Sequence, residues 1–174
     1  MNLAQSFQDK LQTSADSFAW GAEQVPPERR DVRPPLGLGK WTATRHVFHM
    51  MYYEHHVALP GMRQWLGGPR VGIKELQEKA AWGQGQDWAR SLRGFREVRD
   101  EQIALLAEFD DAAWDEERHT LWGPVTLRWV VSKTCQHTAE HASNVLQIAL
   151  FWDHFGVSGF LRRIASLRDA RESR

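Results

Sequence analysis

The sequence has little cysteine and no net charge, and each shortage excludes a class of protein. Among its 174 residues is one cysteine, Cys135, which excludes an internal disulfide framework and a zinc site built from several cysteines. The 22 basic and 22 acidic side chains cancel. A surface for nucleic acid or anionic lipid needs an excess of lysine and arginine, so we expect neither partner.

Long apolar runs are also missing. No stretch approaches the roughly 18 uninterrupted apolar residues that a membrane-spanning helix needs. Residues 1–20 lack the basic start and the following apolar stretch of a secretory signal. We therefore expect a cytoplasmic protein without a membrane partner.

The chain has no internal repeat and no low-complexity segment, and it lacks the alternation of polar and apolar residues that predicts strands. Apolar residues make up 42% of the sequence, which at this length is enough for one domain with a sizeable core. We expect a single domain over residues 1–174, with a terminal tail at 160–174. Five arginines on a weakly amphipathic pattern indicate that this tail is a solvated helix.

Four segments place apolar residues at helical spacing. We predict helices at residues 2–23, 41–66, 87–109 and 126–154. Pro60 and Gly61 predict a kink or break in the second helix, and Asp87 is the expected N-cap of the third. Residues 24–39, 70–86 and 110–125 are predicted loops, the second with one short helical turn. The prediction is an all-α fold, and a four-helix bundle is its natural packing.

Six of the eight histidines lie on two of these helices. His137 and His141 are four residues apart in the fourth helix, so their side chains leave from one face and can converge on one metal ion. A third ligand must come from another helix. The second helix offers one face with four candidates: His46, His49, Tyr53 and His56. Three protein ligands would leave a coordination position open, as in catalytic metal sites.

The polar residues around these histidines strengthen the metal hypothesis. A single His-x-x-x-His pair often arises by chance. Here, however, Lys133 and Asn144 extend the pair into a polar patch on an otherwise apolar helix, and a polar patch in a core is costly unless it is satisfied. We take Tyr53, Lys133 and Asn144 as candidates for a substrate or cofactor pocket. Cys135 lies about 200° around the helix from His137 and is interpreted as a packing residue.

Two segments together resemble the DinB/YfiT-like superfamily. In residues 39–54, Trp41, His49 and Glu54 match the first metal-ligand motif of that family. The second motif resembles residues 122–129 followed by His137-Thr138-Ala139-Glu140-His141. The resemblance implies a four-helix bundle of up-down-down-up topology that carries a divalent metal on three histidines. It assigns the ligands to His49, His137 and His141, whereas the spacing alone left His46 and His56 open.

The resemblance also implies a chemistry. Family metals include zinc and nickel, and characterised members are often transferases or isomerases that use a low-molecular-weight thiol such as bacillithiol or mycothiol. Many members form dimers, so a homodimer is expected. Ser143 and Asn144 stand where members often have Gly-Gln, which leaves the subfamily and the pocket chemistry open.

Three functions remain in competition. The first is metal-dependent transfer or isomerisation, in which a thiol attacks a small electrophile. The second is metal-dependent hydrolysis of a small ester or amide, with Glu140 as general base or supporting group. His137–His141 also has the H-x-x-E-H form of inverted zinc peptidases, but few acidic residues follow it to supply the further ligand. The third is a non-catalytic, stress-associated bundle that binds a small molecule or a partner. Arg45 and Lys133 are candidates to hold a carboxylate, or are solvated surface residues.

Overall fold

The computed structural model describes residues 2–156, so the tail predicted at 160–174 lies outside the described residues. The first helix, α1 (Leu3–Glu23), begins after Asn2, whose side chain accepts a hydrogen bond from the amide of Gln5. It ends before the two prolines at 26 and 27, as predicted, because proline disfavours helix in the residue before it. The following connection is irregular apart from one 3₁₀ turn, Pro27–Arg29.

The second predicted helix is one continuous helical segment, not a broken one. It comprises α2 (Ala43–Tyr53), a π-helical turn (Glu54–Ala58), α3 (Leu59–Arg63) and a 3₁₀ turn (Gln64–Leu66). Pro60 has no N–H, and in an α-helix its ring would crowd the carbonyl four residues earlier. The wider π turn ends at Ala58, two residues before Pro60, and contains that carbonyl, so the chain passes the proline without a break.

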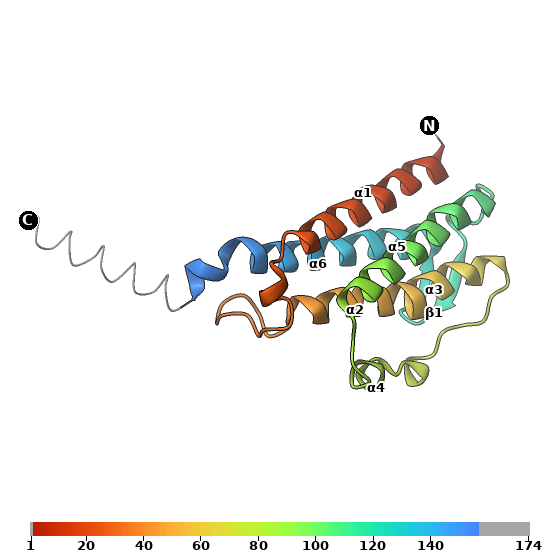
Figure 1. Cartoon of the computed structure of the whole chain (residues 1–174). Coiled ribbons are helices and arrows are strands. Elements are labelled where there is room, and N and C mark those ends of the chain that lie inside the picture. Colours follow the sequence, from red (N-terminus) through yellow and green to blue (C-terminus); the bar gives the residue numbers. More distant parts are fainter. Residues whose placement is uncertain (1, 157–174) are drawn as a thin grey trace, which may run out of the picture.

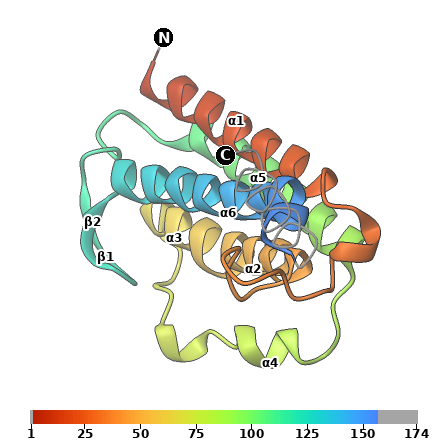
Figure 2. The same ribbon diagram turned by 90° about the vertical axis from the view of Figure 1, so that its left-hand side faces the viewer.

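Residues 67–87 form a strap that runs outside the bundle beside α2 (Figure 2). It contains two short helical pieces, a 3₁₀ turn (Ile73–Glu75) and α4 (Glu78–Trp82), where the sequence predicted one. Near its two ends, Gly67 and Gly85 both have a φ of 84°, a conformation that favours glycine. The amide of Gln77 donates a hydrogen bond to the Tyr52 hydroxyl at 2.7 Å, which fastens the strap to α2.

The last two long helices match their predicted positions. Asp87 caps α5 (Trp88–Leu105) by accepting a hydrogen bond from the amide of Arg90, and a 3₁₀ turn (Leu106–Glu108) follows. Thr126 caps α6 (Leu127–Phe155), which ends at Gly156. Both caps satisfy an amide that the first helical turn leaves without a partner.

The prediction of no strands is wrong. Strands β1 (Glu117–Thr120) and β2 (Gly123–Thr126) form an antiparallel hairpin in which Glu117 lies opposite Thr126 and Thr120 opposite Gly123. Each strand has only four residues, too few for an alternating pattern to be recognised in the sequence. Gly123, with φ 94°, makes the tight turn possible.

The described chain is mostly helical, as predicted, and its long helices pack side by side (Figure 1). Helix α1 packs along α6 and contacts α5, while α2 packs on α5 and contacts α6. One apolar cluster includes Leu11, Met62 and Leu127, and a second is built around Phe18, Phe95 and Val145. Within residues 2–156, no helix is both long and apolar enough to cross a membrane.

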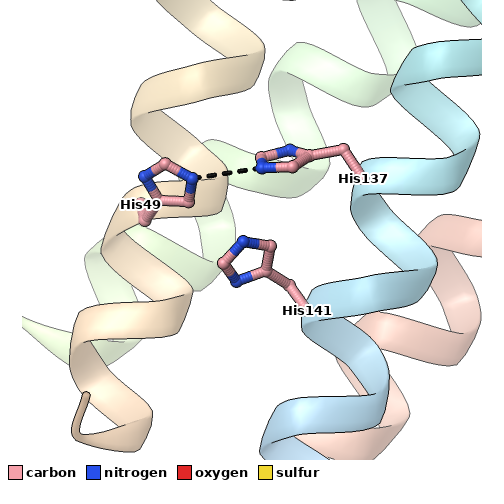
Figure 3. Close-up of side chains that lie close together, drawn as sticks. All are labelled: His49, His137 and His141. Atoms are coloured by element: carbon pink, nitrogen blue, oxygen red, sulfur yellow. Dashed lines mark hydrogen bonds between the residues drawn. The ribbon is translucent and has the colours of Figure 1, made fainter. Parts of the chain in front are cut away.

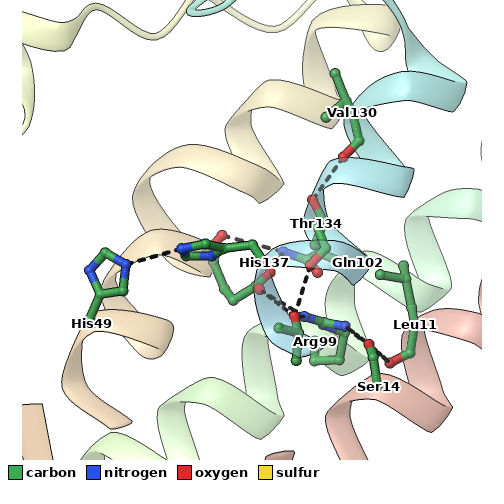
Figure 4. Close-up of polar contacts among 10 residues, drawn as sticks. Leu11, Ser14, His49, Arg99, Gln102, Val130, Thr134 and His137 are labelled. Atoms are coloured by element: carbon green, nitrogen blue, oxygen red, sulfur yellow. Dashed lines mark hydrogen bonds and ion pairs between the residues drawn. The ribbon is translucent and has the colours of Figure 1, made fainter. Parts of the chain in front are cut away.

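A layer of buried polar groups joins the long helices (Figure 4). At its centre, the Arg99 guanidinium on α5 contacts the Glu54 carboxylate at 2.7 Å, and both side chains are at most 1% exposed. Arg99 also donates to the Leu11 carbonyl, Ser14 and Thr138, so one side chain connects all of the long helices. Gln102 donates to the second oxygen of Glu54 at 2.7 Å.

Candidate metal centre

Three histidines converge between α2 and α6 (Figure 3), and two of them, His49 and His137, lie beside the polar layer in Figure 4. His49 comes from α2, and His137 and His141 come from successive turns of α6. Each offers one ligand atom, and these atoms all lie within 4.8 Å of one another. The Nε2 atoms of His49 and His137 are 3.2 Å apart. Two nitrogens on a tetrahedral ion at about 2.0–2.1 Å would be about 3.3 Å apart, so this group could bind a metal ion.

Contacts at the other ring nitrogens leave the Nε2 atoms available. His49 Nδ1 lies 2.9 Å from Oε1 of Glu78, to which its N–H can donate a hydrogen bond. His141 Nδ1 lies 2.9 Å from Nδ1 of His46. The buried Nδ1 of His137 has no hydrogen-bond partner within residues 2–156. With Nδ1 occupied in two of the three rings, Nε2 is the atom that His49 and His141 can present to an ion.

The electrostatic environment keeps the imidazoles of His46, His137 and His141 neutral, and the neutral imidazole is the form that binds metal. Burial lowers the pKa of His137 to about 4 and that of His141 to about 2, and the nearby charge of His49 adds to both effects. Burial likewise lowers the pKa of His46 to about 4. Desolvation of the charged form is the main cause in each case. At neutral pH these three rings therefore carry free lone pairs.

The structure separates the other histidine candidates from this group. His46 is buried against His141 but belongs to no set of three potential ligands among the described residues. His56 is exposed and its ring lies over that of Tyr52, at 4.2 Å between centroids. The regular spacing placed His56 on the face of His49, but a wider π turn begins at Glu54 and contains His56, which moves His56 off that face.

Tyr53 lies against the histidine group. Its ring is 4.0 Å from that of His137, centroid to centroid, and its buried hydroxyl has no hydrogen-bond partner in residues 2–156. Burial raises the pKa of Tyr53, and the nearby Glu54 carboxylate raises it further. The hydroxyl therefore keeps its proton and is an unused hydrogen-bond donor beside the candidate site.

The remaining predicted pocket residues lie on α6. Lys133 donates a hydrogen bond to the Gln136 side chain at 3.0 Å, and Gln136 in turn donates to Glu140 at 2.7 Å. Gln136 and Glu140 are exposed, so this chain of contacts occupies the solvent-facing side of the helix. Asn144 is half-buried, three residues beyond His141. The roles predicted for Lys133, Glu140 and Asn144 stay predictions.

Glu78 and the surroundings of Arg45 were not predicted from the sequence. Glu78 Oε1 accepts hydrogen bonds from both Arg45, at 2.6 Å, and His49. The Arg45 guanidinium also lies 4.9 Å from the ring centroids of both Trp41 and Trp82, so it is held by protein groups and is not a free surface residue. Burial alone would raise the pKa of Glu78, but His49 and Arg45 outweigh it and lower that pKa.

Glu54, which the family resemblance singled out, is an internal anchor and does not belong to the histidine group. Glu54 directly follows Tyr53 in the sequence, and Thr138 directly follows His137. The Thr138 hydroxyl accepts a hydrogen bond from Arg99, so it belongs to the same polar layer as Glu54. The Thr138 hydroxyl donates to the Thr134 carbonyl at 2.9 Å. Arg99 and Thr138 were not predicted, and the only signal for them was polarity within helix faces that are otherwise apolar.

Cys135 packs against the apolar cluster around Leu11, as predicted.

Comparison with known proteins agrees with this architecture. The sequence model of the DinB superfamily matches residues 10–145, which is most of the chain. The protein therefore belongs to the DinB superfamily. A search of curated protein sequences finds no match.

Solved structures give the same fold. The mycothiol-dependent maleylpyruvate isomerase superposes with a TM-score of 0.66 at 16% sequence identity, and covers 83% of this chain. A histidine-to-alanine mutant of that isomerase superposes with the same TM-score at 15% identity. The chain spans 61% of the length of the isomerase chain that it matches. At this level of identity, the likeness establishes the shared fold.

Proposed function

We propose that this protein is a divalent-metal-dependent enzyme that uses a low-molecular-weight thiol either to isomerise a small electrophilic substrate or to form a thioether with it. The observation that carries the proposal is the group of His49, His137 and His141, with two Nε2 atoms 3.2 Å apart. Zinc or nickel suits such a set of imidazoles. When bound there, the ion would act as a Lewis acid that holds a thiol as its thiolate.

The superfamily and its solved relative support the thiol part of the proposal. The isomerase of the same fold is mycothiol-dependent, which favours a mycothiol-type thiol here. Three protein ligands leave room for a fourth from outside the chain. In an isomerisation, the thiol adds to a carbon–carbon double bond and leaves again, so it is recovered. In a transfer, the thiolate sulfur forms a bond to an electrophilic carbon of the substrate and the whole thiol stays in the product as a thioether. The thiol proton then leaves with the displaced group, or in an addition to a double bond it ends on the neighbouring carbon.

The chain's own residues supply binding and orientation. The unused hydroxyl of Tyr53 beside His137 is a donor for a carbonyl or carboxylate oxygen of the substrate. The Trp41 ring, with its centroid 5.0 Å from that of His49 and 5.9 Å from that of His141, supplies an apolar wall. Lys133, Glu140 and Asn144 on α6 are candidates to complete the pocket or to move a proton.

The test is a product analysis with zinc-loaded protein, mycothiol and maleylpyruvate, followed by a panel of other small electrophiles. The expected result is a trans isomer with the thiol recovered, or a thioether with the thiol consumed, and no product without thiol. His49→Ala should abolish this activity, Tyr53→Phe should reduce it, and His56→Ala should leave it unchanged.

Other outcomes favour the competing functions. Cleavage of esters or amides by the zinc-loaded protein without thiol would support the hydrolase and contradict the thiol enzyme. Metal binding without turnover on either panel would favour a non-catalytic binding protein.

We also propose the finer architecture that the family resemblance implies. It is a four-helix bundle of α1, α2–α3, α5 and α6 in up-down-down-up order, assembled as a homodimer. The packing of α1 along α6 and of α2 on α5 supports this arrangement of helices. Light scattering on the purified full chain tests the dimer, since a monomeric mass would contradict it.

A further inference from the structure

The strap contributes one carboxylate to the neighbourhood of the histidine group. Oε1 of Glu78 lies 2.9 Å from Nδ1 of His49, and the Glu78 side chain is 24% exposed against 16% for His49. A carboxylate in this position accepts a hydrogen bond from Nδ1–H of the imidazole. This hydrogen bond favours the tautomer that leaves Nε2 without a proton, and it also fixes the orientation of the ring.

The position of Glu78 is itself set by other side chains. The same Oε1 accepts a hydrogen bond from Arg45, one helical turn before His49. Trp82, at the other end of α4, lies 5.3 Å from the Phe48 ring, centroid to centroid, and Tyr52 accepts from the amide of Gln77, the residue before Glu78. These contacts hold α4 against α2, so the carboxylate meets the imidazole in one defined geometry.

We propose that Glu78 is a positioning residue for the metal centre: it holds His49 as the Nδ1–H tautomer and aims Nε2 at the ion. The inference rests on the proposed metal site and extends it to a segment that contributes no ligand. It assigns the strap a function, because the strap is the only part of the described chain that places a carboxylate on His49.

The test compares Glu78→Ala with Glu75→Ala in the full-length protein. Glu75 is an exposed carboxylate in the same strap, three residues earlier, and serves as the matched control. Zinc affinity is measured by competition with a chromogenic chelator. Loss of an outer-shell partner typically weakens metal binding 10- to 100-fold, so we expect about that loss in Glu78→Ala and less than about a twofold change in Glu75→Ala.

A second measurement needs no metal. Nitrogen-15 spectra of zinc-free, histidine-labelled protein at pH 8 report which ring nitrogen carries the proton, and the His49→Ala spectrum identifies the His49 signals. We expect the Nδ1–H form in the wild type and in Glu75→Ala, and a shift to Nε2–H or a mixture in Glu78→Ala. A residue that only stabilised the strap would not change this tautomer.

The proposal is overturned if the two alanine variants bind zinc equally well, or if His49 keeps the same tautomer in both. If the wild type binds no zinc, the proposed function fails. The spectra of the zinc-free protein then still decide whether Glu78 positions His49.

Discussion

Removal of the buried Arg99 guanidinium should be among the most destabilising single changes to this protein. The Arg99→Met substitution keeps most of the side-chain length but leaves the Glu54 carboxylate, 0% exposed, without its cation. Breaking a buried pair by removing one partner costs about 3–5 kcal/mol, since the remaining charge stays buried and uncompensated. Arg99→Met also removes the hydrogen bonds that the guanidinium donates to the Leu11 carbonyl and the Ser14 hydroxyl on α1.

The assay is urea unfolding followed by tryptophan fluorescence, with thermal unfolding as a second measurement. For a domain of this size, a loss of about 3–5 kcal/mol should lower the midpoint temperature by roughly 6–20 °C. The matched control is Arg96→Met on the same helix, because the Arg96–Glu23 pair is about half exposed on both sides. An exposed pair contributes about 0–1 kcal/mol, so the control should unfold almost like the wild type.

The double variant Glu54→Gln with Arg99→Met separates charge from packing. Removing both charges avoids an unpaired ion, so the double variant should be more stable than Arg99→Met alone. The reasoning is refuted if Arg99→Met costs no more than Arg96→Met, or if the second substitution adds its full cost to the first.

Three further predictions concern the fold and the thiol. Thr126→Ala should lower the free energy of unfolding in urea by about 1 kcal/mol, because it removes the hydrogen-bond acceptor for the Trp129 amide at the start of α6. Thr126→Ser keeps a hydroxyl and should keep most of that stability. Equal stability of the two variants would contradict the cap. Phe95→Ala should cost about 3–5 kcal/mol in the same assay, since the ring is 0% exposed and lies 4.8 Å from that of Phe18; a loss below about 1 kcal/mol would contradict its place in the core. Burial raises the pKa of Cys135. Iodoacetamide at pH 8 should therefore alkylate the folded protein at least about tenfold more slowly than the urea-unfolded chain. Equal rates would show that the thiol is accessible in the folded protein.

The sequence predicted the long helices well because their boundaries are local. Asp87 and Thr126 cap helices within a few residues of themselves, and α1 ends shortly before the paired prolines at 26 and 27. The hairpin 117–126 could not be predicted in this way. Its four-residue strands owe their pairing to each other and to the chain around them, not to a pattern in either strand.

The candidate site was only partly predictable for the same reason. The i, i+4 spacing of His137 and His141 is a local signal, and it correctly placed both rings on one side of α6. The choice of His49 over His56 came from the family resemblance, since the π turn that moves His56 away has no clear sequence signal. Glu78 reaches His49 through a contact between residues 29 positions apart, which no periodicity in the sequence encodes.

The central claim is that His49, His137 and His141 bind one divalent ion. The most direct test is elemental analysis of the untagged full-length protein after zinc loading and desalting, alongside His49→Ala, His141→Ala and the exposed control His56→Ala. We predict close to one equivalent of zinc in the wild type and in His56→Ala, and almost none in the other two variants. Zinc retained by His49→Ala, or none bound by the wild type, would contradict the site.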